Sequence, residues 1–194
     1  MKFEHQVPDY QDFDAYMETM RQLVEGGKTT GENQSESFVN YTKLNFSRLK
    51  RLNKTSKLNP LVLEKLKNIQ KPQFWLVLSE SWCGDAAQNL PVINKMVEAS
   101  SHIELGLILR DEHLDIMDDF KTNGGRSIPK LIALDEDKNV LFTWGPRPNE
   151  AQQMYLGYRN GVSGQTNEEF KFALHQWYAK DKGDTTQQEI AALL

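Results

Sequence analysis

Hydrophobic positions in the first third of the chain recur at the spacing of a helix. In Tyr10–Val24 they fall three and four positions apart, and Gly26-Gly27 ends the run. Ser35 or Ser37 can cap a second helix, and Asn59-Pro60 begins a third, because proline is tolerated in a first helical turn. The second helix is expected to bury an apolar stripe made of Phe38, Tyr41, Leu44, Phe46, Leu49 and Leu52.

From Pro72 onward, short apolar segments alternate with amphipathic ones, which indicates a sheet crossed by helices. The polar turn Asp135–Asn139 predicts an antiparallel hairpin, whereas strands joined by helical crossovers are expected to be parallel. The expected strands are Phe74–Leu78, Glu104–Leu109, Lys130–Leu134 and Val140–Thr143, and the expected helices are Ala86–Ala99, His113–Lys121, Glu150–Asn160 and Asn167–Lys180.

These patterns predict an α/β fold with a mixed sheet of about four strands and helices on both faces. We expect residues 1–70 to form an N-terminal helical extension and residues 71–182 to form the sheet domain. Residues 183–194 form a C-terminal tail that either docks as a short helix or frays.

Composition and charge narrow the classes of function. One cysteine and four scattered histidines exclude a disulfide framework and a cysteine-rich zinc site, so no metal is expected. A net charge of −4 argues against nucleic-acid binding. The start of the chain has no signal-peptide pattern and no apolar run could span a bilayer, so we expect a cytoplasmic protein that does not bind membranes. One basic cluster is interpreted as the solvated face of a helix, with an anionic partner as the alternative: Arg48, Lys50, Arg51, Lys54 and Lys57.

The single cysteine, Cys83, lies where an apolar strand meets a helix. Unpaired N–H groups and the helix dipole at that point favour the thiolate. The polar residues Glu80 and Ser81 favour an exposed sulfur, although a buried, inert thiol is the alternative. Ala86 occupies the position where a dithiol oxidoreductase has its second cysteine, so Cys83 cannot close an intrachain disulfide.

The run Trp82-Cys83-Gly84-Asp85-Ala86 after a strand, followed later by Ile128-Pro129 before another strand, resembles the thioredoxin superfamily. The resemblance covers about Lys71–Lys180, and the added N-terminal helices resemble a bacterial thioredoxin-like subgroup with such an extension. It implies a thioredoxin-like fold, a cis bond before Pro129, and Ile128 backbone groups that bind an extended peptide or a glutathione-like backbone. It further implies a catalytic Cys83 and a substrate-binding surface made of Trp82, Gly84, Asp85, Ile128 and Pro129.

Three residues depart from that family pattern. Ala86 replaces the resolving cysteine, and Val77 replaces a buried aspartate that would accept its proton. Asp85 replaces a proline. Its charge raises the pKa of the thiol while the helix end lowers it, so the sequence leaves the direction of the net pKa shift open. Alternatively, Asp85 is an acidic residue in the first helical turn that accepts hydrogen bonds from its free backbone N–H groups. Trp82 can likewise be an ordinary core residue.

Three functions fit this sequence. The first is single-cysteine thiol–disulfide exchange in cell redox homeostasis, with a protein or a small thiol such as glutathione as partner and no other cofactor. The second is a non-catalytic module that binds peptides or proteins, and the third is a thiol redox sensor. Arg110 and Arg126 either form ion pairs or attract an acidic partner. Dithiol reductase activity is excluded for the isolated chain, and the oligomeric state stays open.

Overall fold

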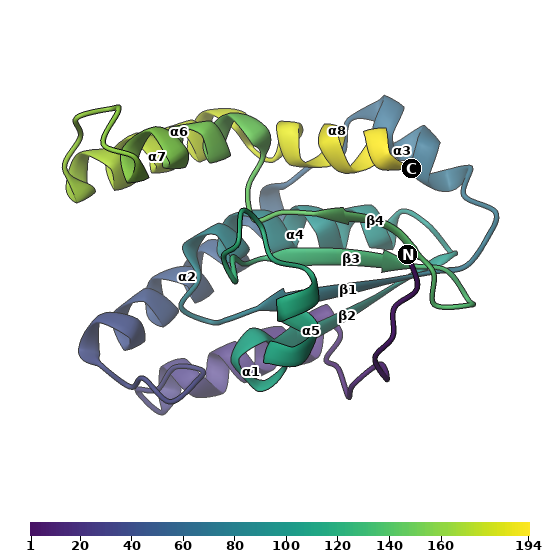
Figure 1. The fold of residues 1–194 in the computed structure, drawn as a ribbon, viewed down its shortest axis with the longest axis horizontal. Helices are drawn as coiled ribbons and strands as arrows, with labels where there is room; N and C mark the ends of the chain where they lie inside the picture. The colour runs from purple at the N-terminus through teal and green to yellow at the C-terminus, as the bar shows by residue number, and fades with distance from the viewer.

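The computed structural model describes residues 1–194, and a four-stranded sheet with the order β2-β1-β3-β4 lies at its centre (Figure 1). The strands are β1 (Gln73–Ser79), β2 (Ile103–Leu109), β3 (Lys130–Leu134) and β4 (Val140–Trp144). The helices are α1 (Phe13–Glu25), α2 (Glu36–Thr55), α3 (Pro60–Lys67), α4 (Gly84–Glu98), α5 (Leu114–Asp119), α6 (Asn149–Arg159), α7 (Asn167–Asp181) and α8 (Asp184–Leu193), with a 3₁₀ turn at Arg110–Glu112. The predicted α/β class and the mixed four-stranded sheet are confirmed.

Strand direction differs from the prediction at one place. β1 and β2 are parallel and β3 and β4 are antiparallel, as expected, but β3 runs antiparallel to β1. The reason is the short helix between β2 and β3. The six residues of α5 span roughly 9 Å, whereas seven-residue β2 spans roughly 23 Å, so α5 cannot return the chain to the other end of the sheet.

The central strands are buried almost along their whole length, as is usual for a sheet covered on both faces. One apolar cluster joins them to the N-terminal helices through Met20, Leu49 and Leu66, and to α8 through Ile190. The C-terminal tail therefore docks as a helix. The core runs across both expected boundaries, and the division into residues 1–70, 71–182 and 183–194 stays a prediction.

Helix α2 buries a more polar face than its apolar stripe predicts. Its buried residues are Thr42, Asn45 and Leu49, while Leu44 is 46% exposed. The Thr42 hydroxyl hydrogen-bonds the Ser81 hydroxyl at 3.0 Å, and Asn45 Nδ2 donates to the Ser81 carbonyl at 3.0 Å. Polar residues face inward because α2 covers the loop after β1, whose backbone needs hydrogen-bond partners.

Helices α6 and α7 extend beyond the sheet as a pair, on the same side of the view in Figure 1 as the first half of α2. They share a small core of their own, made of Ala151, Phe170, Leu174 and Tyr178. The N-terminus of α4 lies between α2 and this pair, so three helices surround the end of β1 where Cys83 lies.

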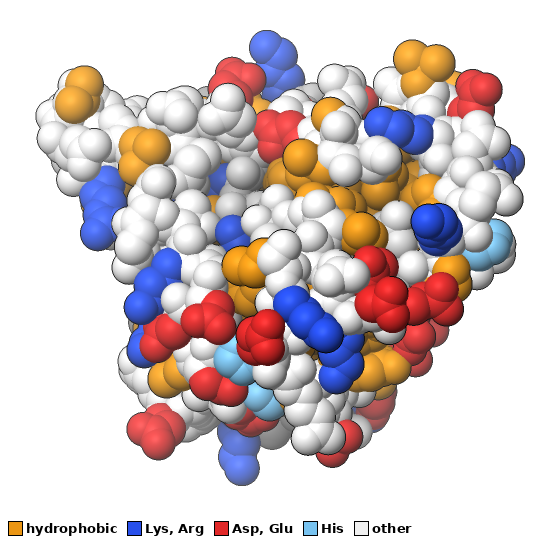
Figure 2. All heavy atoms as spheres, turned by 45° about the vertical axis from the view of Figure 1, so that its right-hand side comes forward, with side chains coloured by type: hydrophobic (Ala, Val, Ile, Leu, Met, Phe, Trp, Pro, Cys, Tyr) orange, Lys and Arg blue, Asp and Glu red, His pale blue; other side chains and the backbone are white.

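The face drawn in Figure 2 carries acidic and basic side chains interspersed with one another, with no large area of one sign. No helix of the structure combines the length and the apolar character that crossing a bilayer requires.

Candidate functional site

Cys83 is the N-cap residue of α4, directly after the loop that ends β1. Its Sγ accepts a hydrogen bond from the Ala86 N–H at 3.4 Å and donates one to the Ile128 carbonyl at 3.3 Å. The residue is only 7% exposed. The expectation of an exposed sulfur is therefore wrong.

The polar residues before Cys83 are buried because they hold the N-terminal loop in place. The Glu80 carboxylate accepts hydrogen bonds from the Asp111 N–H at 2.9 Å and from the Thr30 hydroxyl, and the Ser81 hydroxyl accepts from the Thr30 N–H at 3.0 Å. Glu80 and Ser81 are each 1% exposed. Burial raises the pKa of Glu80 above its usual range. The polar side chains of Glu80 and Ser81 therefore form an internal hydrogen-bond network and do not indicate an exposed surface.

Burial, with a smaller contribution from the Asp85 charge, raises the pKa of the Cys83 thiol to about 12. The Ala86 N–H and the Arg147 guanidinium lower it, but by less. The helix end therefore favours the thiolate as expected, but the sum of the effects, left open by the sequence, is a raised pKa. Desolvation outweighs the dipole, and the sulfur carries its proton at neutral pH.

Asp85 lies in the first turn of α4 but forms its contacts with the other side of the site. Its Oδ2 lies 2.6 Å from Arg147 Nη2, and its Oδ1 accepts the Tyr178 hydroxyl at 2.9 Å. The two side chains of the ion pair are 14% and 12% exposed. Burial raises the pKa of Asp85, and the Arg147 charge opposes that shift. Asp85 thus connects the start of α4 to α7 and to the segment after β4.

Arg147 is held by the run Gly145-Pro146-Arg147-Pro148 after β4, and its guanidinium lies 4.2 Å from the Tyr155 ring centre. Gly145 has φ +112, and a Cβ there would lie 2.2 Å from the Pro129 carbonyl oxygen. Only glycine fits this approach. Arg147 was not among the residues predicted for the site, although an arginine between two prolines after a strand is a signal for a fixed backbone position.

We expect Gly145→Ala to destabilise the fold by more than about 2 kcal/mol, because the new methyl group would overlap backbone in a conformation that L residues rarely adopt. Chemical denaturation measures this loss. Gly157→Ala is the matched control: it lies in α6 with open space around it and should stabilise by about 0.5–1 kcal/mol. Equal effects of the two changes would contradict the close approach at Gly145.

The Ile128–Pro129 peptide bond is cis. Ile128 is 5% exposed, its carbonyl accepts the Cys83 thiol, and its N–H has no hydrogen-bond partner within the protein. Pro129 is buried behind it. A free N–H beside a sulfur can bind a carbonyl of a ligand, which is the role that the family resemblance implies for Ile128.

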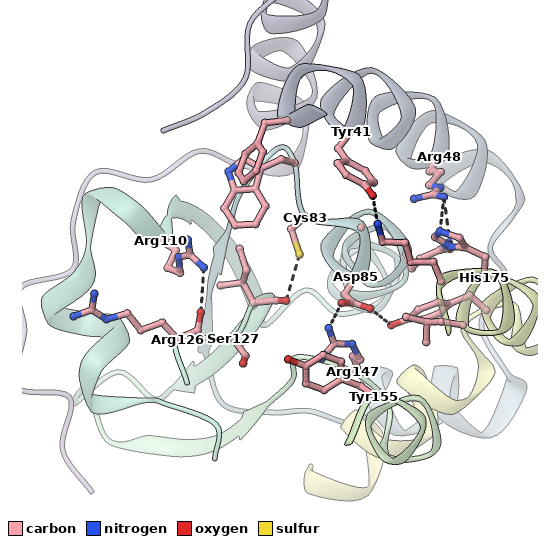
Figure 3. A pocket seen from close by; sticks show the side chains of 18 residues that line it. Tyr41, Arg48, Cys83, Asp85, Arg110, Arg126, Ser127, Arg147, Tyr155 and His175 are labelled. Carbon is pink, nitrogen blue, oxygen red and sulfur yellow. Dashed lines mark hydrogen bonds and ion pairs between the residues drawn. The ribbon is translucent and has the colours of Figure 1, made fainter. Parts of the chain in front are cut away.

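A cavity of about 530 Å³ opens beside Cys83 (Figure 3). Of the predicted site residues, Trp82, Cys83, Gly84, Asp85 and Ile128 line it, and Pro129 does not. Half-buried Trp82 forms part of the wall, with its ring 5.0 Å from the Phe38 ring and 5.0 Å from the Arg110 guanidinium carbon. The lining residues that the sequence analysis did not assign to a site include Tyr41, Arg48, Arg147, Tyr155, His175 and Tyr178.

Positive charge surrounds this cavity from two sides. In Figure 3, Arg110 and Arg126 lie on one side of Cys83, and Arg48 and Arg147 lie on the other, with the His175 ring next to Arg48. Arg110 pairs with Asp111 at 2.7 Å and Arg126 with Asp118 at 2.7 Å, so their ion-pair interpretation is confirmed. Arg48 does not fit the predicted solvated face of α2, because it is half-buried and lines the cavity.

Comparison with known proteins agrees with this geometry. A family model described as "Thioredoxin" matches residues 31–169. A crystal structure of a protein of unknown function, PA1234 from Pseudomonas aeruginosa, superposes with a TM-score of 0.58 at 18% identity and covers 94% of this chain and 96% of that one. An HIV epitope-scaffold gives a TM-score of 0.57 at 18% identity, with 89% and 95% of the two chains covered. No curated protein matches the chain.

Proposed function

This chain belongs to the thioredoxin family, and we propose that it carries out single-cysteine thiol–disulfide exchange with a low-molecular-weight thiol through Cys83. The observation that carries the proposal is the position of Cys83 in the wall of a cavity of about 530 Å³. Cavities of this size fit small molecules. The N–H of Ile128, whose carbonyl accepts the Cys83 thiol, has no partner within the protein and offers a contact for the backbone of such a ligand.

The exchange balances in two steps. The Cys83 sulfur attacks one sulfur of a small disulfide, a Cys83–S–S–R bond forms, the original S–S bond breaks, and the leaving thiolate takes the Cys83 proton. A second small thiol then attacks the R sulfur, which releases a new small disulfide and returns Cys83 to the thiol. The first step uses an external small disulfide and the second an external small thiol, because the chain has no second cysteine.

The reaction at neutral pH should be slow. With a thiol pKa of about 12, only a small fraction of the sulfur is thiolate, and the thiolate is the attacking form. The Ala86 N–H and the Arg147 charge favour the thiolate locally, and deprotonation would break the hydrogen bond to the Ile128 carbonyl and free the sulfur to attack. The rate should therefore rise steeply with pH.

Mass spectrometry of the intact protein tests the proposal. After incubation with oxidised glutathione at pH 8.5, the folded protein should gain one glutathione on Cys83, and excess reduced glutathione should remove it. Cys83→Ser is the control and should gain none. If folded wild-type protein gains no adduct while urea-unfolded protein does, Cys83 does not exchange and the proposal fails.

One observation favours a second candidate, a binding module without turnover. A sulfur that donates a hydrogen bond to Ile128 and has a raised pKa suits a structural thiol. This candidate predicts that Cys83→Ser binds the same ligands as the wild type, and that no adduct forms. The same raised pKa disfavours the redox-sensor alternative, because peroxide also reacts with the thiolate.

A further inference from the structure

Arg48 and His175 meet in the wall of the Cys83 cavity although 127 positions separate them in the chain. Arg48 Nη2 lies 3.1 Å from His175 Nε2 and 3.4 Å from Nδ1, and Figure 3 shows the two side chains facing each other between α2 and α7. An arginine has only donors, so the His175 nitrogen that faces it must be the unprotonated acceptor, and His175 is neutral while Arg48 donates to it. Two basic groups therefore lie together in a half-buried position.

No carboxylate forms an ion pair with Arg48 or His175. Arg110, Arg126 and Arg147 each have an acidic partner within 4.0 Å, but Arg48 has none. Asp85, the acidic group that lines the same cavity, is already paired with Arg147. The exposed cations that surround Arg48 and His175 have no carboxylate within that distance either: Arg51, Lys171 and Lys182.

A second cavity of about 490 Å³ adjoins the first at this point, and Arg48, Gln88, His175 and Tyr178 line both. No acidic residue lines the second cavity. The buried Ser56 hydroxyl, which also belongs to its lining, has no hydrogen-bond partner. The second cavity thus holds a free hydroxyl, and the unpaired Arg48 charge lies where the two cavities join.

The protonation of both groups reflects this surplus of positive charge. Burial and the Arg51 charge lower the pKa of Arg48, against smaller opposing effects of Tyr41 and Asp85. Burial together with the Arg48 and Lys171 charges lowers the pKa of His175. A bound anion would offset these repulsions, because it would supply the negative charge that the protein itself lacks here.

We propose that Arg48 and His175 form a subsite for an oxyanion, a carboxylate or a phosphate, on the small molecule that occupies the Cys83 cavity. The subsite deepens the proposed function, since it makes an anionic thiol or disulfide the preferred substrate class. It lies on α2 and α7, across the cavity from Arg110 and Arg126. The ligand would therefore reach from the sulfur to the anion subsite across the cavity.

Rates of mixed-disulfide formation with three small disulfides test the subsite: 3,3′-dithiodipropionate, which is anionic, 2-hydroxyethyl disulfide, which is neutral, and cystamine, which is cationic. The wild type should react fastest with the anionic and slowest with the cationic reagent. Arg48→Gln should lower the ratio of the anionic to the neutral rate about tenfold, since hydrogen bonds to charged groups contribute at that level. Lys54→Gln removes a charge from the same helix outside both cavities and should leave the ratio within about twofold.

Succinate and inorganic phosphate, added separately at constant ionic strength, should slow the reaction of the anionic disulfide more than that of the neutral one. The stronger competitor shows which oxyanion the subsite prefers. Equal ratios in the wild type and Arg48→Gln would overturn the subsite and leave the exchange proposal standing. If no reagent reacts, the exchange proposal fails, and calorimetry of dithiodipropionate with Cys83→Ser then decides on the subsite. Binding that Arg48→Gln weakens about tenfold supports it, and no binding overturns it.

Discussion

Replacing Arg147 by glutamine is expected to destabilise the protein by about 3–5 kcal/mol, which is the usual effect of removing one partner of a buried ion pair. The change leaves the Asp85 carboxylate, 12% exposed, with the Tyr178 hydroxyl as its main remaining partner. Urea denaturation at pH 7 measures the loss. The loss should be smaller at pH 4, because a protonated Asp85 needs no opposite charge and its pKa is already raised by burial.

Two further variants separate the ion pair from simple loss of packing. Asp85→Asn combined with Arg147→Gln removes both charges, and the asparagine can still accept the Tyr178 hydroxyl, so roughly half or more of the lost stability should return. Arg159→Gln changes an exposed arginine at the end of α6 and should have an effect below about 0.5 kcal/mol. A double variant as unstable as Arg147→Gln alone would show that the pair does not stabilise Asp85.

The second large effect is a loss of stability in alkali that depends on Cys83. The pKa of this thiol is about 12 in the folded protein against 9.0 for an ordinary cysteine. The unfolded state therefore releases its proton first, and the stability that the buried thiol contributes is complete below pH 9 and is lost as pH rises toward 12. Each unit of pKa difference corresponds to about 1.4 kcal/mol, so the total stability lost is roughly 4 kcal/mol.

The difference in unfolding free energy between the wild type and Cys83→Ser isolates this effect. Serine does not titrate in this range, and the tyrosines titrate in both proteins, so their contribution cancels. This difference should be constant from pH 6 to 8. Above that range the wild type should lose about 1.4 kcal/mol of stability per pH unit relative to Cys83→Ser. A difference that stays constant up to pH 11 would mean that the sulfur is not desolvated.

The sequence was sufficient for the elements whose pattern is local. Strand Lys130–Leu134 and the hairpin after it follow from an apolar run and a polar turn, and both are present. The direction of β3 relative to β1 could not be predicted in this way, because it depends on how far the short α5 carries the chain. Pairing between distant strands is a property of the whole chain path.

The same distinction applies to the site. The resemblance to the thioredoxin superfamily predicted Trp82, Asp85 and Ile128 as site residues, and all three line the cavity. Arg48 and His175 were missed because only the packing of α2 against α7 brings them together. A buried sulfur was only the alternative, because the polar Glu80 and Ser81 favoured exposure, whereas these two residues hydrogen-bond Thr30 in the N-terminal loop.

The most direct test of the account is the concentration dependence of mixed-disulfide formation by folded wild-type protein with 2-hydroxyethyl disulfide. If Cys83 reacts inside the cavity, the observed rate rises linearly with disulfide concentration, exceeds the rate of global unfolding, and increases about tenfold per pH unit from pH 7 to 10. A rate that saturates at the unfolding rate would mean that the sulfur reacts only in the unfolded chain, and it would contradict exchange at this site.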